Sequence, residues 1–172
     1  MTPTIRPLSP AEAEAALPDL AALLMEAVAD GASVGFLPPL PQDQAVRFWQ
    51  TVVAGVAAGE RTLLAAVDGA RLVGTVQLVR SSMPNQVHRG DVAKMLVARA
   101  AQRQGLGATL LLAVEDVARA AGLRLLVLDT VPGHAGERLY QRHGWLRAGA
   151  IPGYALDGVG GAFATIFFYK QL

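Results

Sequence analysis

The sequence predicts an α/β fold with a mixed, mostly antiparallel sheet of about seven strands and about four helices. Seven short apolar segments have the length of strands, and four longer segments repeat their apolar residues at helical spacing. Asp68-Gly69 separates two of the strand segments and is a strong hairpin signal, which makes those strands antiparallel. No repeat or linker divides the 172 residues, so residues 1–172 are expected to form a single domain.

Composition excludes several classes of protein. The chain is 52 % hydrophobic and 17 % charged, which excludes a disordered protein. Its net charge of +1, with no basic run, predicts no nucleic-acid partner. The N-terminus lacks a signal-peptide pattern and the apolar runs are short, so we expect a cytoplasmic protein with no membrane partner. Cysteine is absent, which excludes a thiol nucleophile, and the abundance of alanine and arginine is typical of a GC-rich bacterial genome.

The first third of the chain is predicted to hold one strand and two helices. A short strand at residues 5–8 precedes a helix that begins at Ser9, because Ser9 and Glu12 have the spacing of a capping box. Pro18 is expected to break or kink this helix. A loop and a second helix follow, at residues 31–41 and 42–58.

The remainder is predicted to start with an antiparallel meander. Its strands begin at Thr62, at Ala70 and at residue 87. The best helical pattern, residues 105–121, is followed by residues 123–131, which are nearly all apolar, as in a strand covered on both faces. A short helix and two closing strands complete the pattern, at residues 135–143, 145–156 and 162–171.

The stretch QRQGLG, residues 102–107, joins a predicted strand to the best predicted helix. Backbone N–H groups at a helix start are unpaired and carry the positive end of the helix dipole. Glycine removes the side chain that would keep a diphosphate away from them, so this loop could bind a pyrophosphate. Alternatively, Gly105 and Gly107 only relieve strain where the strand turns into the helix.

A dinucleotide-binding fold is a rival interpretation of this loop, because Asp129 follows it at about the expected spacing. However, Leu110 occupies the position of the third glycine in that fingerprint. Residues 98–104 also make the turn too long, and only one strand–helix–strand unit is present. These features disfavour the dinucleotide fold.

Two motifs resemble those of the GNAT acetyltransferases. Residues 97–108, VARAAQRQGLGA, resemble the acetyl-CoA-binding motif of that family, and residues 139–145, LYQRHGW, resemble its second motif. They stand in the right order, and the resemblance covers almost the whole chain. It implies the GNAT fold, in which a central pair of strands splays apart. The segments HRGDVAKMLV, LLVLDT, IPGYAL and FYKQL are similar to the branch that contains the tabtoxin-resistance acetyltransferases.

The resemblance implies an acetyl-CoA-dependent N-acetyltransferase that needs no metal. The implied reaction is direct attack of a primary amine on the thioester, with an amino-acid-like or an antibiotic- or toxin-like small molecule as acceptor. A protein or peptide N-acetyltransferase and a CoA-binding module without turnover remain as alternatives. A homodimer would fit such relatives.

The resemblance also assigns residues to the cofactor. The strand that ends at Val97 would pair its free backbone with the amides of pantetheine, as an added strand would. The glycine loop and the first turn of the following helix would hold the pyrophosphate. The implied cofactor-binding residues are Met95, Leu96, Val97, Gln102, Arg103, Gln104, Gly105, Leu106, Gly107, Ala108 and Thr109.

Two residues are implied as catalytic. Tyr140 occupies the family position whose hydroxyl faces the sulfur, and a phenol can protonate a departing thiolate. Asp129, at the end of its strand, would accept the amine proton or bind the ammonium. The alternatives are a half-buried aromatic packing residue for Tyr140 and a turn or capping carboxylate for Asp129.

The acceptor amine is expected to meet four further residues. Asp91 lies where many relatives carry an acidic base and is expected to share a strand face with Met95 and Val97; the alternative is a solvated strand charge. On the cofactor side, many relatives carry an asparagine that touches the cofactor at the position of Gly133, and we expect that cofactor contact to be missing or supplied by His134. The expected substrate-binding residues are Phe36, His88, Asp91 and Tyr154.

Overall fold

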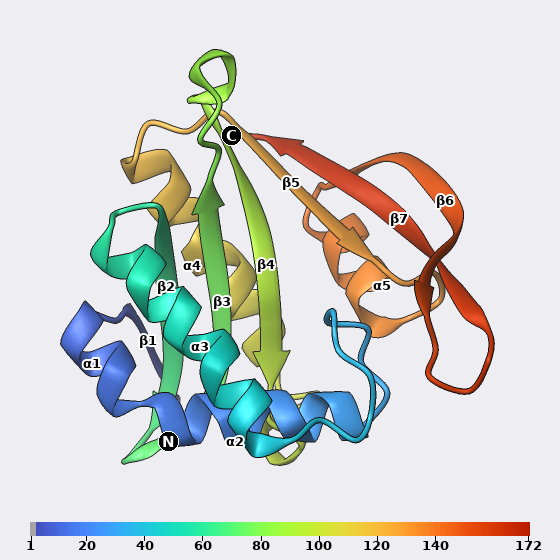
Figure 1. Cartoon of the computed structure of the whole chain (residues 1–172). Coiled ribbons are helices and arrows are strands. Elements are labelled where there is room, and N and C mark those ends of the chain that lie inside the picture. The colour runs from blue at the N-terminus through green and yellow to red at the C-terminus, as the bar shows by residue number, and fades with distance from the viewer. Residues whose placement is uncertain (1–2) are drawn as a thin grey trace.

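The computed structural model, which describes residues 3–172, contains one seven-stranded sheet (Figure 1). Its strands lie in the order β1-β2-β3-β4-β5-β7-β6, and every neighbouring pair is antiparallel except β4 and β5. This confirms the predicted mixed, mostly antiparallel sheet. The strands are β1 (Thr4–Pro7), β2 (Arg61–Asp68), β3 (Arg71–Arg80), β4 (Arg89–Val97), β5 (Leu125–Thr130), β6 (Leu146–Leu156) and β7 (Ala162–Gln171).

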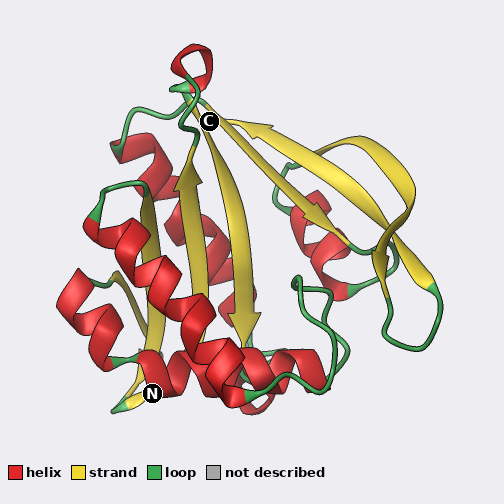
Figure 2. Ribbon diagram, viewed as in Figure 1, coloured by secondary structure: helices red, strands yellow, loops and turns green. Residues whose placement is uncertain are grey.

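Helices cover both faces of the sheet (Figure 2). Three of them pack on one face in a core that includes Trp49, and α4 and α5 cover the other face in a core that includes Trp145. No helix within residues 3–172 is long and apolar enough to cross a membrane. The helices are α1 (Pro10–Ala15), α2 (Leu17–Ala29), α3 (Gln42–Ala57), α4 (Leu106–Ala120) and α5 (Ala135–Arg142).

The first predicted helix is two helices, which raises the number from about four to five. The break falls at Ala16, so Pro18 lies in the first turn of α2, where its missing N–H costs no hydrogen bond. The capping box at the start of α1 is present: Ser9 N donates to Glu12 Oε2 at 2.8 Å, and Glu12 N donates to Ser9 Oγ at 3.3 Å. These bonds, with Arg6 beside Glu12, lower the pKa of its carboxyl to about 2.

The central strands β4 and β5 pair over a short distance only. Their parallel register runs from Arg89 beside Leu125 to Asp91 beside Val127, and the two strands then diverge (Figure 1). On its other edge β4 contains a bulge, because its pairing with β3 shifts by one residue around Lys94. Lys94 has a φ of +48°. A bulge bends a strand and increases its twist, which turns the end of β4 away from β5.

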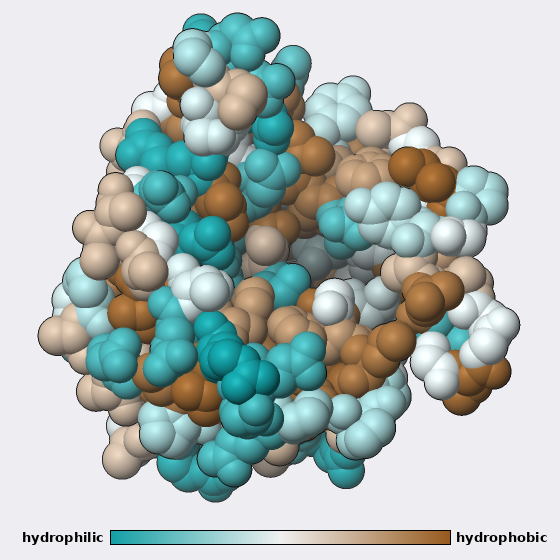
Figure 3. All heavy atoms as spheres, in the orientation of Figure 1, coloured by the Kyte–Doolittle hydropathy of each residue, from teal (hydrophilic) through white to brown (hydrophobic). Residues whose placement is uncertain are grey.

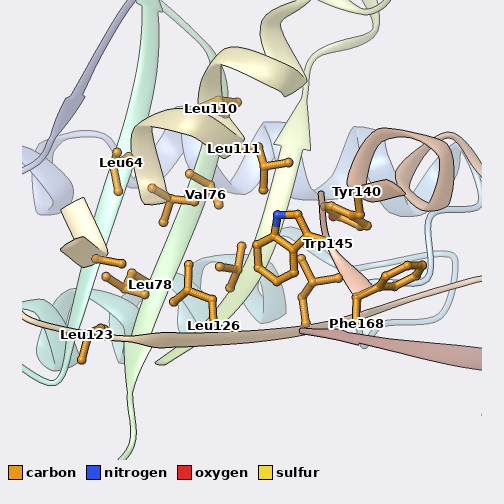
Figure 4. Packing of buried hydrophobic residues seen from close by; sticks show 14 of the residues in the cluster. Leu64, Val76, Leu78, Leu110, Leu111, Leu123, Leu126, Tyr140, Trp145 and Phe168 are labelled. Carbon is orange, nitrogen blue, oxygen red and sulfur yellow. The ribbon is translucent and has the colours of Figure 1, made fainter. Parts of the chain in front are cut away.

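The divergence divides the sheet into a first half, β1 to β4, and a second half, β5, β7 and β6. The second half is anchored by a buried carboxylate on α4. Glu115 is 1 % exposed and accepts a hydrogen bond from Trp145 Nε1 at 2.9 Å and one from Lys170 Nζ at 2.7 Å. The rings of Tyr140 and Phe168 lie 6.0 Å apart, and Trp145 packs beside Tyr140 at 5.9 Å (Figure 4). These contacts fix α5 and β7 on the far side of the opening between β4 and β5.

Candidate functional site

The divergence of β4 and β5 opens a cavity of about 870 Å³. Figure 3 shows the corresponding hollow between the two halves of the molecule. Five parts of the chain contribute to its wall: α2 with the loop after it, β4, the start of α4, the end of β5, and α5. Residues with chemically useful groups in this wall include Ser33, Lys94, Arg103, Asp129, His134, Arg138, Tyr140 and Arg142.

The glycine loop opens into this cavity at the start of α4. Gly105 has a φ of +84°, a conformation that glycine adopts without strain, and no side chain caps the helix. The first intrahelical bond runs from Thr109 N to Gly105 O at 3.1 Å, so the amides of residues 106–108 have no acceptor within the helix. A Cβ at Gly107 would meet only Leu139 Cδ2, at 3.6 Å. The loop therefore presents free N–H groups beside open space.

The structure separates the predicted cofactor residues of this loop into two groups. Gln102, Arg103, Gly105, Gly107 and Ala108 line the cavity. The other three serve the local fold, because Leu106 points into the core, and the side chains of Gln104 and Thr109 donate to backbone carbonyls at 2.9 and 3.3 Å.

The end of β4 supplies the opposite wall. Met95, Leu96 and Val97 all line the cavity, although the side chain of Leu96 is buried in the core. Beyond Asp91 no pairing joins this part of β4 to β5. The backbone edge of residues 95–97 is therefore available to a ligand that carries amides, which is the arrangement the family resemblance implies.

Tyr140 brings a buried phenol to the cavity wall. The residue is 7 % exposed. Burial, together with the negative charge of Asp129, raises the pKa of its hydroxyl above the usual range. Gly136 makes room for it, since a Cβ there would lie 2.9 Å from Thr130 Oγ1 and 3.3 Å from Tyr140 Cε2. The phenol is thus held in its protonated form and can act as a proton donor.

Asp129 lies at the end of β5 with a carboxylate that is exposed to the cavity. Thr165 Oγ1, on the neighbouring strand β7, donates to Asp129 Oδ2 at 2.9 Å. This bond fixes the orientation of the carboxylate and leaves Oδ1 without a partner in the described chain. Asp129 also lines a second, smaller cavity of about 220 Å³, together with Ser33, Gly35, Thr130, Val131, Tyr154, Ala155, Ala164 and Thr165.

Two of the predicted acceptor residues differ in their relation to this smaller cavity. Tyr154 lines it, with its ring packed edge-on against Phe167 at 5.7 Å. Phe36 instead packs edge-on against Phe48 at 5.2 Å. Phe36 therefore anchors the loop after α2, and its neighbours Ser33 and Gly35 line the cavity in its place.

The structure does not bring His88 and Asp91 to either cavity. Both residues belong to the end of the sheet where β4 and β5 are still paired: His88 O accepts from Arg124 N at 2.8 Å, and Asp91 forms an ion pair with Arg89 at 2.8 Å. The expectation that Asp91 shares a face with Met95 and Val97 is wrong. The bulge at Lys94 adds one residue between them, which reverses the alternation of side chains along the strand.

Several polar residues of the cavity were not predicted. Arg138 and Arg142 line it from α5, and their spacing of four residues, around Tyr140, was a signal that could have found them. Glu26 and Asp30 line it from the end of α2 and hold the end of β4, because Glu26 Oε2 accepts from Arg99 N at 3.0 Å and Asp30 pairs with the Arg99 side chain. Lys94 gave no sequence signal, since only the bulge turns it into the cavity.

Comparison with known proteins agrees with this geometry. A curated relative from Azospirillum brasilense, an uncharacterized N-acetyltransferase in the hisH-hisA intergenic region, is 34 % identical over 116 residues, which are 66 % of this chain and 67 % of the relative. The solved structure of ribosomal-protein-alanine N-acetyltransferase from Brucella melitensis is similar, with a TM-score of 0.83 and 22 % identity over 98 % of this chain and 99 % of that one.

A second solved structure is a GNAT superfamily phosphinothricin acetyltransferase from Sinorhizobium meliloti in complex with acetyl-CoA. Its TM-score is 0.82, at 18 % identity over 100 % of this chain and 89 % of that one. The sequence profile of the acetyltransferase (GNAT) family matches residues 25–145, which include the glycine loop and Tyr140. The chain therefore belongs to the GNAT acetyltransferase family.

Proposed function

We propose that this protein transfers the acetyl group of acetyl-CoA to a primary amine of a small molecule. One observation carries the proposal: the free amides of the glycine loop, the unpaired edge of β4, and the side chains of Tyr140 and Asp129 all meet in one cavity. The solved structure of the phosphinothricin acetyltransferase, which contains acetyl-CoA and has the same fold, supports this cofactor.

The residues present fit coenzyme A. Gly107 leaves open a cradle that a larger side chain would fill, next to the positive end of the α4 dipole. Arg103, Arg138 and Arg142 add positive charge to the same wall, where phosphates would lie. The edge of residues 95–97 is extended and unpaired, which suits the amides of pantetheine. The cofactor would supply a thioester, whose carbonyl carbon is open to attack by an amine.

Asp129 and Tyr140 would carry the proton transfers. Asp129 binds the incoming ammonium through its free carboxylate oxygen and accepts the proton that the amine must lose. Tyr140 would donate its phenolic proton to the departing thiolate as the C–N bond forms and the C–S bond breaks, and the second proton, which the new amide nitrogen loses, would restore the phenol. The two groups suit these opposite roles, because the side chain of Asp129 is exposed whereas Tyr140 is buried and holds its proton.

A small acceptor is favoured by the size of the space on the far side of Asp129. The cavity beside Tyr154 and Ser33 is about 220 Å³, below the range of roughly 300–1,000 Å³ for pockets that take drug-sized ligands. The similarity to the phosphinothricin acetyltransferase and the resemblance to the tabtoxin-resistance branch support the same class. A protein N-terminus is the second candidate, because the similar Brucella melitensis structure is a ribosomal-protein-alanine N-acetyltransferase.

The first test is thermal unfolding with acetyl-CoA, NAD and ATP in separate samples. A ligand at 100 times its dissociation constant adds about 2.7 kcal/mol to the free energy of unfolding. We expect a clear shift with acetyl-CoA only. Release of CoA thiol is then measured with a panel of small amines and with peptides that carry a free N-terminus. A shift with NAD, or no shift with acetyl-CoA, contradicts the proposal, and activity toward peptides alone selects the second candidate.

The role of Asp129 is tested with Asp129→Asn, and Asp91→Asn serves as the matched control. Both changes remove one carboxylate from the neighbouring strands β4 and β5, but only Asp129 lines the cavities. We expect Asp129→Asn to lower kcat/KM for the amine about 10²-fold, with the loss greatest at low pH, where the amine keeps its proton. Equal effects of the two substitutions would remove Asp129 from the mechanism.

A further inference from the structure

Lys94 adopts a conformation that its sequence does not explain. It sits at the bulge of β4 with a φ of +48°, in the left-handed region that few residues other than glycine occupy. Such strain persists only where the surrounding structure holds it in place, and it is concentrated at functional sites. Because of the bulge, the side chain of Lys94 emerges on the α3 face of β4, at the wall of the large cavity.

The ammonium of Lys94 lies between α3 and the loop after α2. Its Nζ is 5.5 Å from the centre of the Phe48 ring and would be 3.6 Å from a Cβ placed on Gly35. Gly35 itself lines the smaller cavity. Lys94 therefore lies in the wall of the large cavity, beside Gly35 of the smaller cavity, which we call the acceptor space. The absence of a side chain at Gly35 leaves room next to the ammonium of Lys94.

This ammonium has no anionic partner in the described chain. None of the ion pairs within residues 3–172 includes Lys94, and no hydrogen bond from its Nζ is present. Burial lowers the pKa of Lys94; the negative charge of Asp129 raises it, and the positive charge of Arg61 lowers it further. Arg61 is itself without a carboxylate partner, and its Nε is buried with no hydrogen bond among the described residues.

Charges of opposite sign thus line the large cavity from its two sides, next to the acceptor space, which only Asp129 also lines. Asp129 presents a carboxylate from β5, and Lys94 presents an ammonium from β4. An acceptor that carries both an amine and an oxyanion would match both. Its amine would lie against Asp129, and its oxyanion would supply the counter-charge that Lys94 lacks, at low desolvation cost because Lys94 is already partly buried.

We propose that Lys94 is a specificity-determining residue that binds an oxyanion, such as the carboxylate of an α-amino acid, on the acceptor whose amine is acetylated. This inference rests on the proposed function. The inference goes beyond the proposed function because it selects amines that also carry an oxyanion. Neutral amines lack this group, and in peptide N-termini an amide replaces the carboxylate. The phosphates of CoA are not the partner of Lys94, because they would lie beyond Val97, about 10 Å farther along the strand.

The test compares matched acceptors: α-amino acids, their carboxamides and the corresponding decarboxylated amines. CoA release is measured with the wild type, with Lys94→Met, which keeps the length but not the charge, and with Lys94→Arg, which keeps the charge. Arg71→Gln is the control, because it removes one positive charge from the exposed β2–β3 hairpin, away from the cavity. Thermal shifts with acetyl-CoA are recorded for every variant.

We expect the wild type to favour free acids over carboxamides about tenfold to hundredfold in kcat/KM, mainly through KM. Lys94→Met should abolish this preference and leave the acetyl-CoA shift intact, whereas Lys94→Arg and Arg71→Gln should retain it. Equal activity of the wild type on acids and carboxamides, or an equal loss on both in Lys94→Met, would overturn the inference.

The proposed function and this inference fail in different ways. If acetyl-CoA does not raise the thermal midpoint of the wild type, the proposed function is contradicted and, with it, the role of Lys94. An intact shift without acid preference would remove the role of Lys94 alone. If acetyl-CoA binds but no amine releases CoA, the thermal midpoint of the CoA-loaded protein is measured with amino acids and with their carboxamides. Stabilisation by the acids alone supports the inference, and any other pattern overturns it.

Discussion

The hydroxyl of Tyr140 is a group whose protonation is strongly controlled by the surrounding structure. Trp145 and Phe168 pack around its ring, and Asp129 lies close enough to oppose a second negative charge. Both effects raise the pKa of the phenol above 10.0, the ordinary value. The hydroxyl therefore remains a proton donor over the whole pH range in which enzymes of this kind work.

Replacement of Tyr140 by phenylalanine should separate chemistry from binding. We expect Tyr140→Phe to lower kcat about 10²-fold, because general acids contribute at least that much, and to leave the dissociation constant of acetyl-CoA within about twofold. Single-turnover kinetics and titration with acetyl-CoA measure the two quantities. Tyr169→Phe is the control, since Tyr169 lines neither cavity. An unchanged kcat in Tyr140→Phe at every pH would exclude the acid role.

The raised pKa of Tyr140 also predicts how stability depends on pH. Because the folded pKa lies above the unfolded value, the folded state retains the proton as pH rises, and the unfolded state loses it above about pH 10. This contribution to the free energy of unfolding is complete below pH 10 and declines above it. Denaturant unfolding of the wild type should therefore weaken more steeply above pH 10 than that of Tyr140→Phe, and parallel curves would contradict the burial of the phenol.

At the scale of single elements, the start of α4 is the part of the cavity most sensitive to side-chain size. Gly105 is required by its left-handed backbone, whereas Gly107 is helical and has open space where a Cβ would project. The two positions, one residue apart, are thus occupied by glycine for different physical reasons. Gly105 lets the chain turn into the helix, and Gly107 leaves the helix start without a side chain on the cavity side.

A large side chain at Gly107 should block the cofactor without unfolding the protein. We expect Gly107→Leu to weaken acetyl-CoA binding at least about tenfold, because it fills the space beside the free amides. Its thermal midpoint without ligand should not fall, since leucine replaces glycine inside a helix, which favours the helix by roughly 1 kcal/mol. Calorimetric titration and unfolding of the free protein test both parts. Unimpaired acetyl-CoA binding would place the pyrophosphate elsewhere.

On the scale of the whole molecule, the cavity exists because two halves of the sheet are held apart and yet fixed. The halves share only three paired positions between β4 and β5, so other contacts must hold their relative position. Glu115 provides such a contact: from α4 on the first half it binds Trp145 and Lys170 on the second.

Removal of Glu115 should therefore destabilise the entire fold. Glu115→Ala leaves the ammonium of Lys170 and the indole N–H of Trp145 without their buried partner, and we expect a loss of about 3–5 kcal/mol in the free energy of unfolding. Denaturant unfolding measures this loss. The neighbouring Asp116→Ala is the control, because Asp116 is exposed and pairs only with Arg119. A loss below about 1 kcal/mol for Glu115→Ala would show that other contacts fix the two halves.

Sequence patterns were sufficient where the determining interactions are local. The capping box at Ser9, the Asp68-Gly69 hairpin, the glycine loop and the position of Tyr140 on a short helix each depend on residues a few positions apart, and the structure contains all of them. Local hydrogen bonds and backbone preferences are encoded in such short stretches. The seven-stranded, mostly antiparallel sheet likewise followed from apolar periodicity.

Only the tertiary structure decided which side chains face the cavity. The bulge in β4 arises from its pairing with β3, and it turns Lys94 toward the large cavity while it places Asp91 on the opposite face from Met95. Phe36 is likewise withdrawn by its contact with Phe48, twelve residues away in the chain. Side chains alternate between the two faces of a sheet, so sequence spacing predicts the face of a strand residue only while the pairing stays regular. One extra residue in the strand reverses the alternation. The sequence by itself thus determined the family, the fold and the local structure of the glycine loop, whereas contacts between distant segments determined which side chains line the cavities.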